Sequence, residues 1–303
     1  MNNKRLGTNS SNMLLLLTAA IWGFAFVAQR VGSQYVGAFT FNGLRFALGS
    51  ISLIPLIIYF DKRKKSDNRN ESNIELNSKK SILSGVLVGI ALYSAATLQQ
   101  VGLIYTTAGK ASFITGLYMV FVPIIGIFLK HKIEKKSWIG VVIAVVGLYL
   151  LSVNENFSIG YGDLLEIIGA IFWAIHILTI GYFSNKIDVL KLSFIQFATC
   201  SFLSLISALI FEQITMNGIS QALVPILYGG LLSVGVAFTL QAIAQKNAKP
   251  SHAAIILSME SVFGAIGGAV LLGESMSGRG YMGCILILGG ILVTQIKFSS
   301  KQT

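Results

Sequence analysis

Residues Pro250–Glu274 read PSHAAIILSMESVFGAIGGAVLLGE, a run of apolar and small residues with an acidic side chain, Glu260, near its middle. About 20 apolar residues in a helix can cross the roughly 30 Å hydrocarbon core of a membrane. The run is continuous and does not alternate with period two, which argues against a strand of a membrane barrel. This stretch therefore predicts a transmembrane helix over 251–271 that carries an ionisable residue inside the membrane.

Similar runs fill most of the chain, whose 303 residues are 54% hydrophobic and 12% charged. A soluble protein would carry about 25% charged residues. The expected fold class is an all-α membrane protein of about ten transmembrane helices, in two inverted five-helix repeats with both termini cytoplasmic. The expected spans are 13–33, 39–60, 81–104, 111–129, 137–152, 163–183, 191–210, 222–243, 251–271 and 280–297.

The distribution of basic residues supports this topology. With cytoplasmic termini, nearly all Lys and Arg residues fall on the inside; Lys110 and Arg279 lie outside, and Arg30 and Arg45 lie within or at the ends of helices. This is the positive-inside pattern of membrane proteins, and it accounts for the net charge of +11. A nucleic-acid partner is therefore not expected, because no basic folded surface domain is predicted.

The segment boundaries follow from the same pattern. We expect a cytoplasmic tail over 1–12, a first repeat over 13–152 with a flexible cytoplasmic loop at 61–80, a second repeat over 163–297 and a tail over 298–303. The apolar run from Met13 is long and lacks a convincing cleavage site, so it is interpreted as a retained first helix. Cys200 and Cys284 fall inside spans, one in each half, so neither a disulfide nor a metal site or cofactor is expected.

The two halves also resemble each other. Leu117, Met119 and Val122 recur at one constant spacing as Leu257, Met259 and Val262, and the first helices of the halves align Trp22 with Trp173. Each half holds five predicted helices, an odd number, so the second half must insert upside down. Inverted repeats of this kind are typical of secondary transporters, in which the exchange of two conformations opens a central site to alternate sides.

These stretches carry a family resemblance. The chain resembles the ten-helix EamA-type group of the drug/metabolite transporter superfamily through AAIWGFAFVAQ (Ala19–Gln29), FNGLRF (Phe41–Phe46), LQQVGLIYTTAGKASFITGLYMVFVPI (Leu98–Ile124), the Pro250–Glu274 stretch and GCILILGGIL (Gly283–Leu292). The family often has Pro after the Glu of the ninth helix, where this chain has Ser261. The resemblance implies export or exchange of small metabolites, and a bacterial plasma membrane as the location. It names no ligand, because relatives differ widely in substrate.

Three ionisable residues that lie away from the ends of the predicted spans are candidates for function. Glu260 lies near mid-membrane, where an ionised side chain costs at least ~2.5 kcal/mol and must face a cavity or a partner. It is a candidate for proton coupling, with a hydrogen-bonded structural role as the alternative. Arg45 is a candidate contact for an anionic group or a structural partner, and His176 is a candidate proton relay or a packing residue.

Aromatic and amide side chains are the other candidates. Trp22 and Trp173 occupy equivalent positions away from the membrane interfaces, so they are expected either to wall a central cavity or to pack in the core. Polar side chains that could orient a ligand or bond a neighbouring helix are Tyr118, Gln29, Gln99, Gln100 and Gln241.

The remaining charged residues are interpreted as structural. Glu134 and Glu274 end equivalent helices and are expected to cap loops on opposite sides of the membrane. Asp163 and Glu166 start the sixth helix, where negative charge suits the helix dipole. Arg30 is expected to anchor a helix end.

The function predicted from these features is a secondary transporter that exports or exchanges a small solute, with proton coupling as one form. Its expected partners are the solute, membrane lipid and protons. The alternatives are an intramembrane enzyme and a channel or non-transporting scaffold. An enzyme needs converging groups such as a carboxylate pair or a metal set, and none is recognisable in the sequence.

Overall fold

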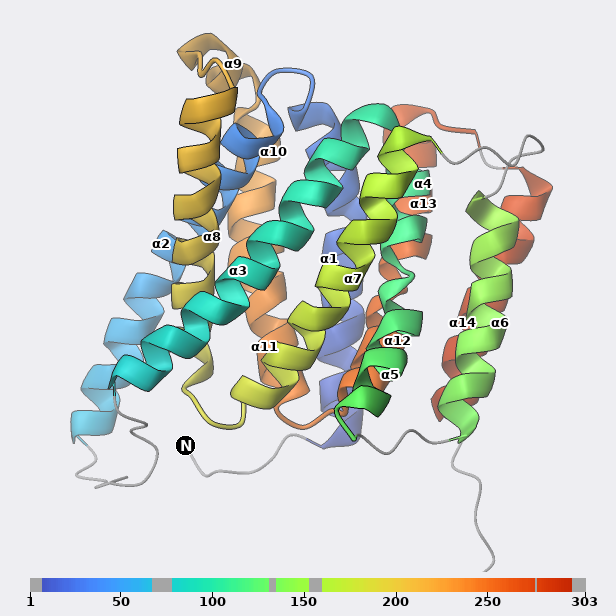
Figure 1. The fold of residues 1–303 in the computed structure, drawn as a ribbon, viewed down its shortest axis with the longest axis horizontal. Helices are drawn as coiled ribbons and strands as arrows, with labels where there is room; N and C mark the ends of the chain where they lie inside the picture. The colour runs from blue at the N-terminus through green and yellow to red at the C-terminus, as the bar shows by residue number, and fades with distance from the viewer. Residues whose placement is uncertain (1–6, 67–77, 131–134, 153–159, 276, 296–303) are drawn as a thin grey trace, which may run out of the picture.

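The structure is a computed structural model that describes residues 7–66, 78–130, 135–152, 160–275 and 277–295, and these ranges form helices and connecting turns without a strand (Figure 1). The first half contains α1 (Thr8–Gly32), α2 (Ala38–Ser66), α3 (Ser78–Gly102), the short 3₁₀ helix η1 (Leu103–Tyr105), α4 (Ala108–Thr115), α5 (Tyr118–Phe128) and α6 (Lys135–Ser152). The second half contains α7 (Tyr161–Phe183), α8 (Val189–Phe211), α9 (Met216–Gln221), α10 (Leu223–Leu227), the π-helix η2 (Tyr228–Phe238), α11 (Thr239–Gln245), α12 (Pro250–Leu257), α13 (Glu260–Leu272) and α14 (Gly278–Gln295). The all-α prediction is confirmed.

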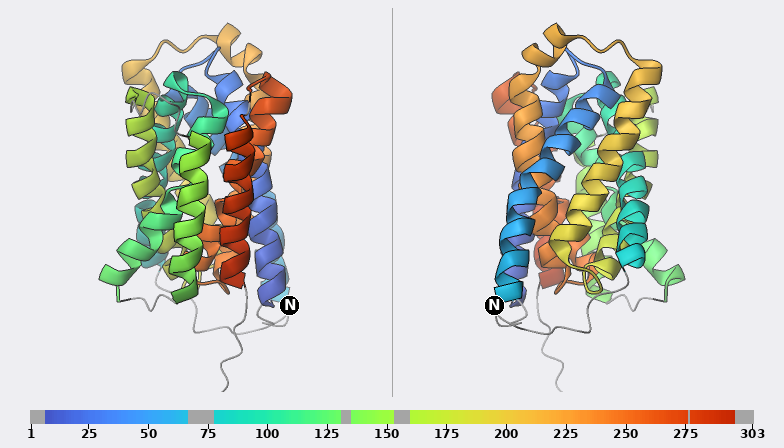
Figure 2. Two further views of the ribbon diagram at one scale, coloured as in Figure 1. Left: turned by 90° about the vertical axis from the view of Figure 1, so that its right-hand side faces the viewer. Right: turned by 90° about the vertical axis from the view of Figure 1, so that its left-hand side faces the viewer.

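Within the described residues, eight helical segments are long and apolar enough to cross a membrane, so the protein is a multi-pass integral membrane protein. They are Thr8–Gly32, Ala38–Arg63, Ser81–Tyr105, Ala108–Phe128, Tyr161–Phe183, Val189–Phe211, Leu223–Gln245 and Pro250–Leu272. The two other expected spans, 137–152 and 280–297, correspond to α6 and α14, which stand side by side at one edge of the bundle (Figure 2, left). Residues 296 and 297 lie outside the described residues, so the total of ten stays a prediction.

The packing of the helices relates the two halves. Helix α1 begins at one end of the bundle and α7 begins at the opposite end (Figure 1). Helix α2 packs against its equivalent α8, and α6 packs against α14. Helix α7 packs against α3, and the equivalent α1 packs against η2 and α11. This mirrored arrangement supports the inverted repeat.

The two ends of the bundle differ in charge. One end, here called the basic end, is where α2 and α5 end and α8 and α12 begin (Figure 1). The helix ends and turns there carry Lys62, Arg63, Lys130, Lys186, Lys191, Lys246 and Lys249 together with Asp61 and Asp188. The opposite end carries Arg30, Lys110 and Arg279 together with Asp163, Glu212 and Glu274. By the positive-inside rule the basic end is the predicted cytoplasmic side.

Two predicted spans are interrupted in the structure. The span expected at 111–129 is two helices, α4 and α5, separated by Gly116 and Leu117, and the span expected at 251–271 is α12 and α13, separated by Ser258 and Met259. At each interruption the backbone makes a tighter turn, with hydrogen bonds to the third residue back such as Met259 N to Ile256 O at 3.1 Å. Apolar composition does not predict such an interruption, because the hydrophobic run continues through it.

Two further boundaries differ from expectation. The stretch expected as a loop over 61–80 is partly helical, because α2 continues to Ser66 and α3 begins at Ser78. The span expected at 222–243 is not one regular helix but consists of α10, η2 and α11 in succession. A π-helical stretch inside a helix is often found at a functional site.

The aromatic core lies between the halves. Trp22, Phe46, Trp173, Phe197 and Phe238 belong to one buried cluster. The outer surface carries exposed apolar side chains such as Phe202, Leu209, Val270 and Ile285, as expected for a surface that faces lipid. Cys200 and Cys284 are free and buried.

Candidate functional site

A small internal cavity lies at the centre of the aromatic cluster, with a volume of about 30 Å³. Eight of the ten residues proposed from the sequence line it: Trp22, Gln29, Arg45, Gln99, Tyr118, Trp173, Gln241 and Glu260. The wall is completed by Ala25, Phe26, Thr115, Ile177, Ser233 and Phe238. These side chains come from both halves, so folding brings them together from α1, α2, α3, α4, α5, α7, η2, α11 and α13.

One wall of the cavity is aromatic. The ring centroids of Trp22 and Trp173 are 6.4 Å apart, and Phe238 contacts both, at 4.5 Å from Trp22 and 5.9 Å from Trp173. The indole N–H of Trp22 donates to Ser233 O at 3.2 Å, which fixes the ring against η2. The equivalent Trp173 N–H has no hydrogen-bond partner among the described residues. The expected cavity position of the two tryptophans matches their place in the structure.

The helix interruptions place two polar groups on the wall. Tyr118 is the first residue of α5 and Glu260 is the first residue of α13. The two side chains are close enough to interact electrostatically. Both are buried, at 2% and 3% exposure. Discontinuous helices at the midplane are the usual means by which transporters present polar groups to a solute.

The crossing of the interrupted helices is held by a hydrogen bond between two serines. Ser261 Oγ donates to Ser112 O at 2.7 Å, while Ser112 Oγ donates to Gly109 O at 2.8 Å and lies 3.4 Å from Ser261 O. Helix α1 passes close to the same point at Gly23, where a Cβ atom would lie 2.8 Å from Glu260 O. Ser261, the residue that departs from the family pattern, thus supplies a hydroxyl donor that proline lacks.

Arg45 brings a positive charge to the cavity. Its Nε donates to Asn42 Oδ1 at 2.9 Å, and its guanidinium lies 4.9 Å from the Phe46 ring centroid. No ion pair joins Arg45 to a carboxylate within the described part of the chain. Because a guanidinium has five N–H donors, most of its hydrogen-bonding capacity is free for a ligand.

Several amide and carboxyl atoms on the wall lack a hydrogen-bond partner within the described residues. Both polar atoms of the Gln241 side chain, the carbonyl oxygen of Gln29 and one carboxyl oxygen of Glu260 have no hydrogen-bond partner in the ranges that the structure describes. Gln99 instead donates to Thr115 Oγ1 at 3.1 Å. Buried polar groups in proteins are nearly always hydrogen-bonded, so this cluster indicates a site that water or a solute fills.

His176 lies behind the aromatic wall and does not line the cavity. It is fully buried, its Nε2 lies 2.9 Å from Gln196 Oε1, and its ring meets Trp173 and Phe238 edge to face. These contacts favour the packing role over the proton relay. Gln100 also lies outside the lining and donates to Ser33 Oγ at 2.8 Å, a bond between helices.

Other residues interpreted as structural have such contacts. Glu274 accepts hydrogen bonds from Ala108 N and Gly109 N, both at 3.0 Å, and so caps α4 as expected of a capping residue. Arg30 Nη1 donates to Leu103 O and Ile104 O and so joins the end of α1 to η1. Glu134 lies outside the described residues.

Glu166 is the residue that sequence reasoning missed. It was interpreted as a helix-dipole partner at the membrane boundary, but it is fully buried, and Thr115 Oγ1 donates to its Oε2 at 3.0 Å. One signal for it was present in the sequence, because Glu166, Ala170, Trp173 and Ile177 recur at helical spacing on the face that points inward.

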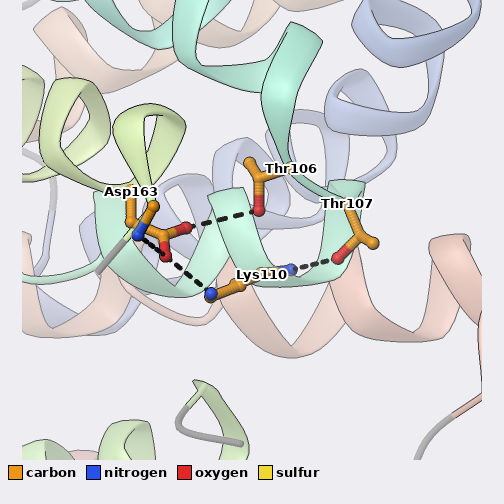
Figure 3. Close-up of polar contacts among 5 residues, drawn as sticks. Thr106, Thr107, Lys110 and Asp163 are labelled. Carbon is orange, nitrogen blue, oxygen red and sulfur yellow. Dashed lines mark hydrogen bonds and ion pairs between the residues drawn. The ribbon is translucent and has the colours of Figure 1, made fainter. Parts of the chain in front are cut away.

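Polar contacts between helices lie toward both ends of the bundle. At the opposite end Lys110 Nζ pairs with Asp163 Oδ2 at 2.6 Å, next to Thr106 and Thr107 (Figure 3). At the basic end His252 Nε2 lies 3.0 Å from Asn12 Oδ1, which joins α12 to α1. The cavity volume of about 30 Å³ is enough for water but far below the 300–1,000 Å³ of typical ligand pockets.

Comparison with known proteins identifies relatives of the whole chain. The sequence pattern of the EamA-like transporter family matches residues 9–153 and again 160–296. A protein of Archaeoglobus fulgidus named "Uncharacterized transporter" is 30% identical over 93% of this chain and 85% of its own length. A protein of Salmonella typhimurium named "Probable amino-acid metabolite efflux pump" is 24% identical over 98% of both chains.

A solved structure shares the fold. A crystal structure superposes with a TM-score of 0.74 at 16% sequence identity, covering 94% of this chain and 96% of the other. At this identity the likeness speaks for the fold alone. The double match of the family pattern agrees with the predicted repeat of the two halves.

Proposed function

This chain belongs to the EamA-like transporter family, and we propose that it is a secondary transporter that moves a small solute through the central cavity by alternating access. Both halves contribute to the wall of the cavity, through α1, α2, α3, α4 and α5 from one and α7, η2, α11 and α13 from the other. If the halves exchange conformations, the same wall residues meet water on alternate sides of the membrane.

The observation that carries the proposal is the set of unsatisfied polar groups on the wall. Tyr118, Trp173, Gln241 and Glu260 each present a polar atom without a hydrogen-bond partner among the described residues. Leaving such a group buried costs about 1–3 kcal/mol. A wall with several of them is explained by a solute that satisfies them when it is bound.

The wall chemistry favours a solute with an anionic group and a flat apolar part. Arg45 offers free donors to a carboxylate, and Trp22, Trp173 and Phe238 offer ring faces. Glu260 can accept from an ammonium group on the same solute. An amino acid or a close derivative meets all three requirements, and the printed name of the Salmonella relative agrees with this class and with export.

Glu260 is the proposed coupling residue. It lies in a span, it is buried, and among the described residues no ion pair compensates its charge. Carrying a proton removes the cost of that charge, so proton binding and solute binding compete at this wall. Proton entry would then drive solute exit.

Two other functional classes have less support. An intramembrane enzyme that uses a metal needs a set of ligands, and no group of three His, Cys, Asp or Glu residues comes together in the described ranges; the relatives are named transporters. A channel needs a continuous path, whereas the cavity has a volume of only about 30 Å³. A non-transporting scaffold has no support from the relatives, which are named as transporters or as an efflux pump.

The proposed setting is a bacterial plasma membrane, with both termini and the basic end in the cytoplasm. The test of the transporter proposal is counterflow in proteoliposomes, with aromatic amino acids, other amino acids, nucleobases and aromatic cations as solutes at two values of pH. Saturable exchange of one class supports a carrier. Non-saturating downhill flux would indicate a channel, and no flux from folded protein would indicate a scaffold.

A further inference from the structure

Glu166 is a second carboxyl group buried in the membrane beside the proposed transport site. It lies on α7, one turn after Asp163, and its side chain is fully buried. It is not part of the cavity wall. Neither its burial nor its contacts are explained by helix capping, because Asp163 already accepts the N-cap hydrogen bond from Gly160 N at 3.1 Å.

A chain of hydrogen bonds joins Glu166 to the cavity. Thr115 Oγ1 donates to Glu166 Oε2 at 3.0 Å, and Gln99 Nε2 donates to Thr115 Oγ1 at 3.1 Å. Thr115 and Gln99 both line the cavity. A hydroxyl has a single hydrogen, so the direction of the bond to Glu166 fixes the direction of the bond to Gln99.

The surroundings of Glu166 accommodate a carboxyl group without neutralising it. Gly102 on α3 makes room for the Glu166 side chain, since a Cβ atom at Gly102 would lie only 3.1 Å from Glu166 Cγ and Oε1. Oε1 has no hydrogen-bond partner in the described part of the chain. The neighbouring cation, Lys110, pairs with Asp163 instead, at 2.6 Å. A buried charge without a partner is costly, so the site suits a carboxyl that can hold a proton.

The groups near Glu166 come from several helices. Helix α3 contributes the uncharged Gly102, and Tyr105 on η1 lies next to Gly162 on α7. Asp163 on α7 and Glu260 on α13 interact electrostatically with Glu166, and Tyr118 on α5 interacts with Glu260. Asp163 pairs with Lys110 on α4 (Figure 3), and 10% and 30% of these two side chains are exposed.

We propose that Glu166 is a second proton-binding site, and that its protonation reverses the hydrogen bonds of Thr115 and Gln99. This inference rests on the proposed transport function. With Glu166 ionised, Thr115 donates to it and accepts from the Gln99 amide nitrogen, which leaves the Gln99 carbonyl oxygen for the cavity. With Glu166 protonated, its O–H donates to Thr115, and Thr115 donates to the Gln99 carbonyl oxygen after the amide rotates.

The consequence is a cavity wall that changes from acceptor to donor when one proton binds. The proton comes from water at the Asp163–Lys110 end and adds to the Glu166 carboxylate; no other covalent bond forms or breaks. A solute that donates to Gln99 binds the ionised state, and a solute that accepts binds the protonated state. Proton binding and solute binding are thereby linked through a residue that touches no solute.

The direct test needs no solute. Infrared difference spectroscopy of the protein in lipid vesicles, recorded during a pH titration, detects the carbonyl stretch of protonated carboxyl groups. We expect Glu166→Gln to lose a band that Glu260→Gln keeps, with Asp61→Asn as the matched control at an exposed ion pair. Thr115→Val should shift the Glu166 band, and Thr115→Ser should restore it. A Glu166→Gln spectrum identical to that of the unmodified protein overturns the inference.

A second measurement separates this inference from the transport proposal. With L-phenylalanine as the probe, Thr115→Val should flatten the pH profile of counterflow, expressed relative to its own maximum because Thr115 lines the cavity, whereas Thr115→Ser should retain the profile. If the unmodified protein exchanges none of the proposed solute classes, the transport proposal fails and the infrared result still decides the inference. If transport is present and Thr115→Val keeps the full pH profile, the hydrogen-bond reversal is wrong.

Discussion

Tyr118 and Glu260 are each the first residue after a helix interruption, one in each half, and both side chains line the same cavity. Near each interruption some backbone N–H and C=O groups lack a regular helical hydrogen bond, so side chains of neighbouring helices can bond to the backbone there. Ser261 Oγ, for example, donates to Ser112 O. Interrupted helices can bend at these points, so they are the proposed hinges of alternating access.

Glu260→Gln removes the proposed proton-binding group with little change in shape. We expect proton-driven accumulation of solute to be lost while solute counterflow continues, because exchange requires the cavity but not the proton. The measurement compares uptake driven by an imposed pH gradient with counterflow in the same vesicles. Asp61→Asn, whose partner Lys191 lies 3.2 Å away at the basic end, is the control. Unchanged accumulation with an unchanged pH profile would make Glu260 structural.

Arg45→Gln removes the cation of the cavity. Hydrogen bonds to a charged group are worth about 1.5–3 kcal/mol, so the affinity for a carboxylate-bearing solute should fall by roughly 10- to 100-fold. A solute without the anionic group should lose little. The control is Arg279→Gln, at a residue whose guanidinium lies over the Tyr149 ring far from the cavity. Equal losses for both solutes would assign Arg45 to helix packing.

Trp22→Phe and Trp173→Phe form a matched pair. Trp22→Phe removes a hydrogen bond to Ser233 O and should lower the free energy of unfolding by about 1 kcal/mol. Trp173→Phe removes an N–H that has no partner among the described residues, so stability should change less while the affinity for solute falls. Thermal unfolding in detergent and the concentration dependence of counterflow separate the two effects. The reverse ranking would contradict the assigned roles.

The pair of Lys110 and Asp163 is expected to close the cavity at the opposite end. Asp163→Asn should weaken closure and raise the access of water-soluble reagents to a cysteine placed at Gln241, whereas exchanging the two residues should restore closure. A partly exposed ion pair contributes about 1 kcal/mol or less, so a several-fold change in labelling rate is expected. If the exchanged pair labels like Asp163→Asn, the ion pair is not the closing contact.

Hydropathy alone identified eight spans that the structure confirms, because a helix that crosses lipid needs a minimum length and an apolar surface whatever its neighbours are. The cost of polar groups in the membrane likewise pointed to Glu260 and Arg45, and repeat matching pointed to the two tryptophans. These arguments depend on the lipid around each helix and not on which helices are its neighbours, so they can be made from one sequence.

The tertiary structure alone decided which of these side chains meet. Glu166 appeared to lie at the water boundary by its place in the chain, but α3 and α4 cover it, and His176 appeared central but lies behind Trp173. The helix interruptions before Tyr118 and Glu260 were also hidden, because apolar composition continues through them. The burial and the hydrogen bonds of a side chain depend on residues from other helices. Which helices come close to one another is decided only when the bundle packs.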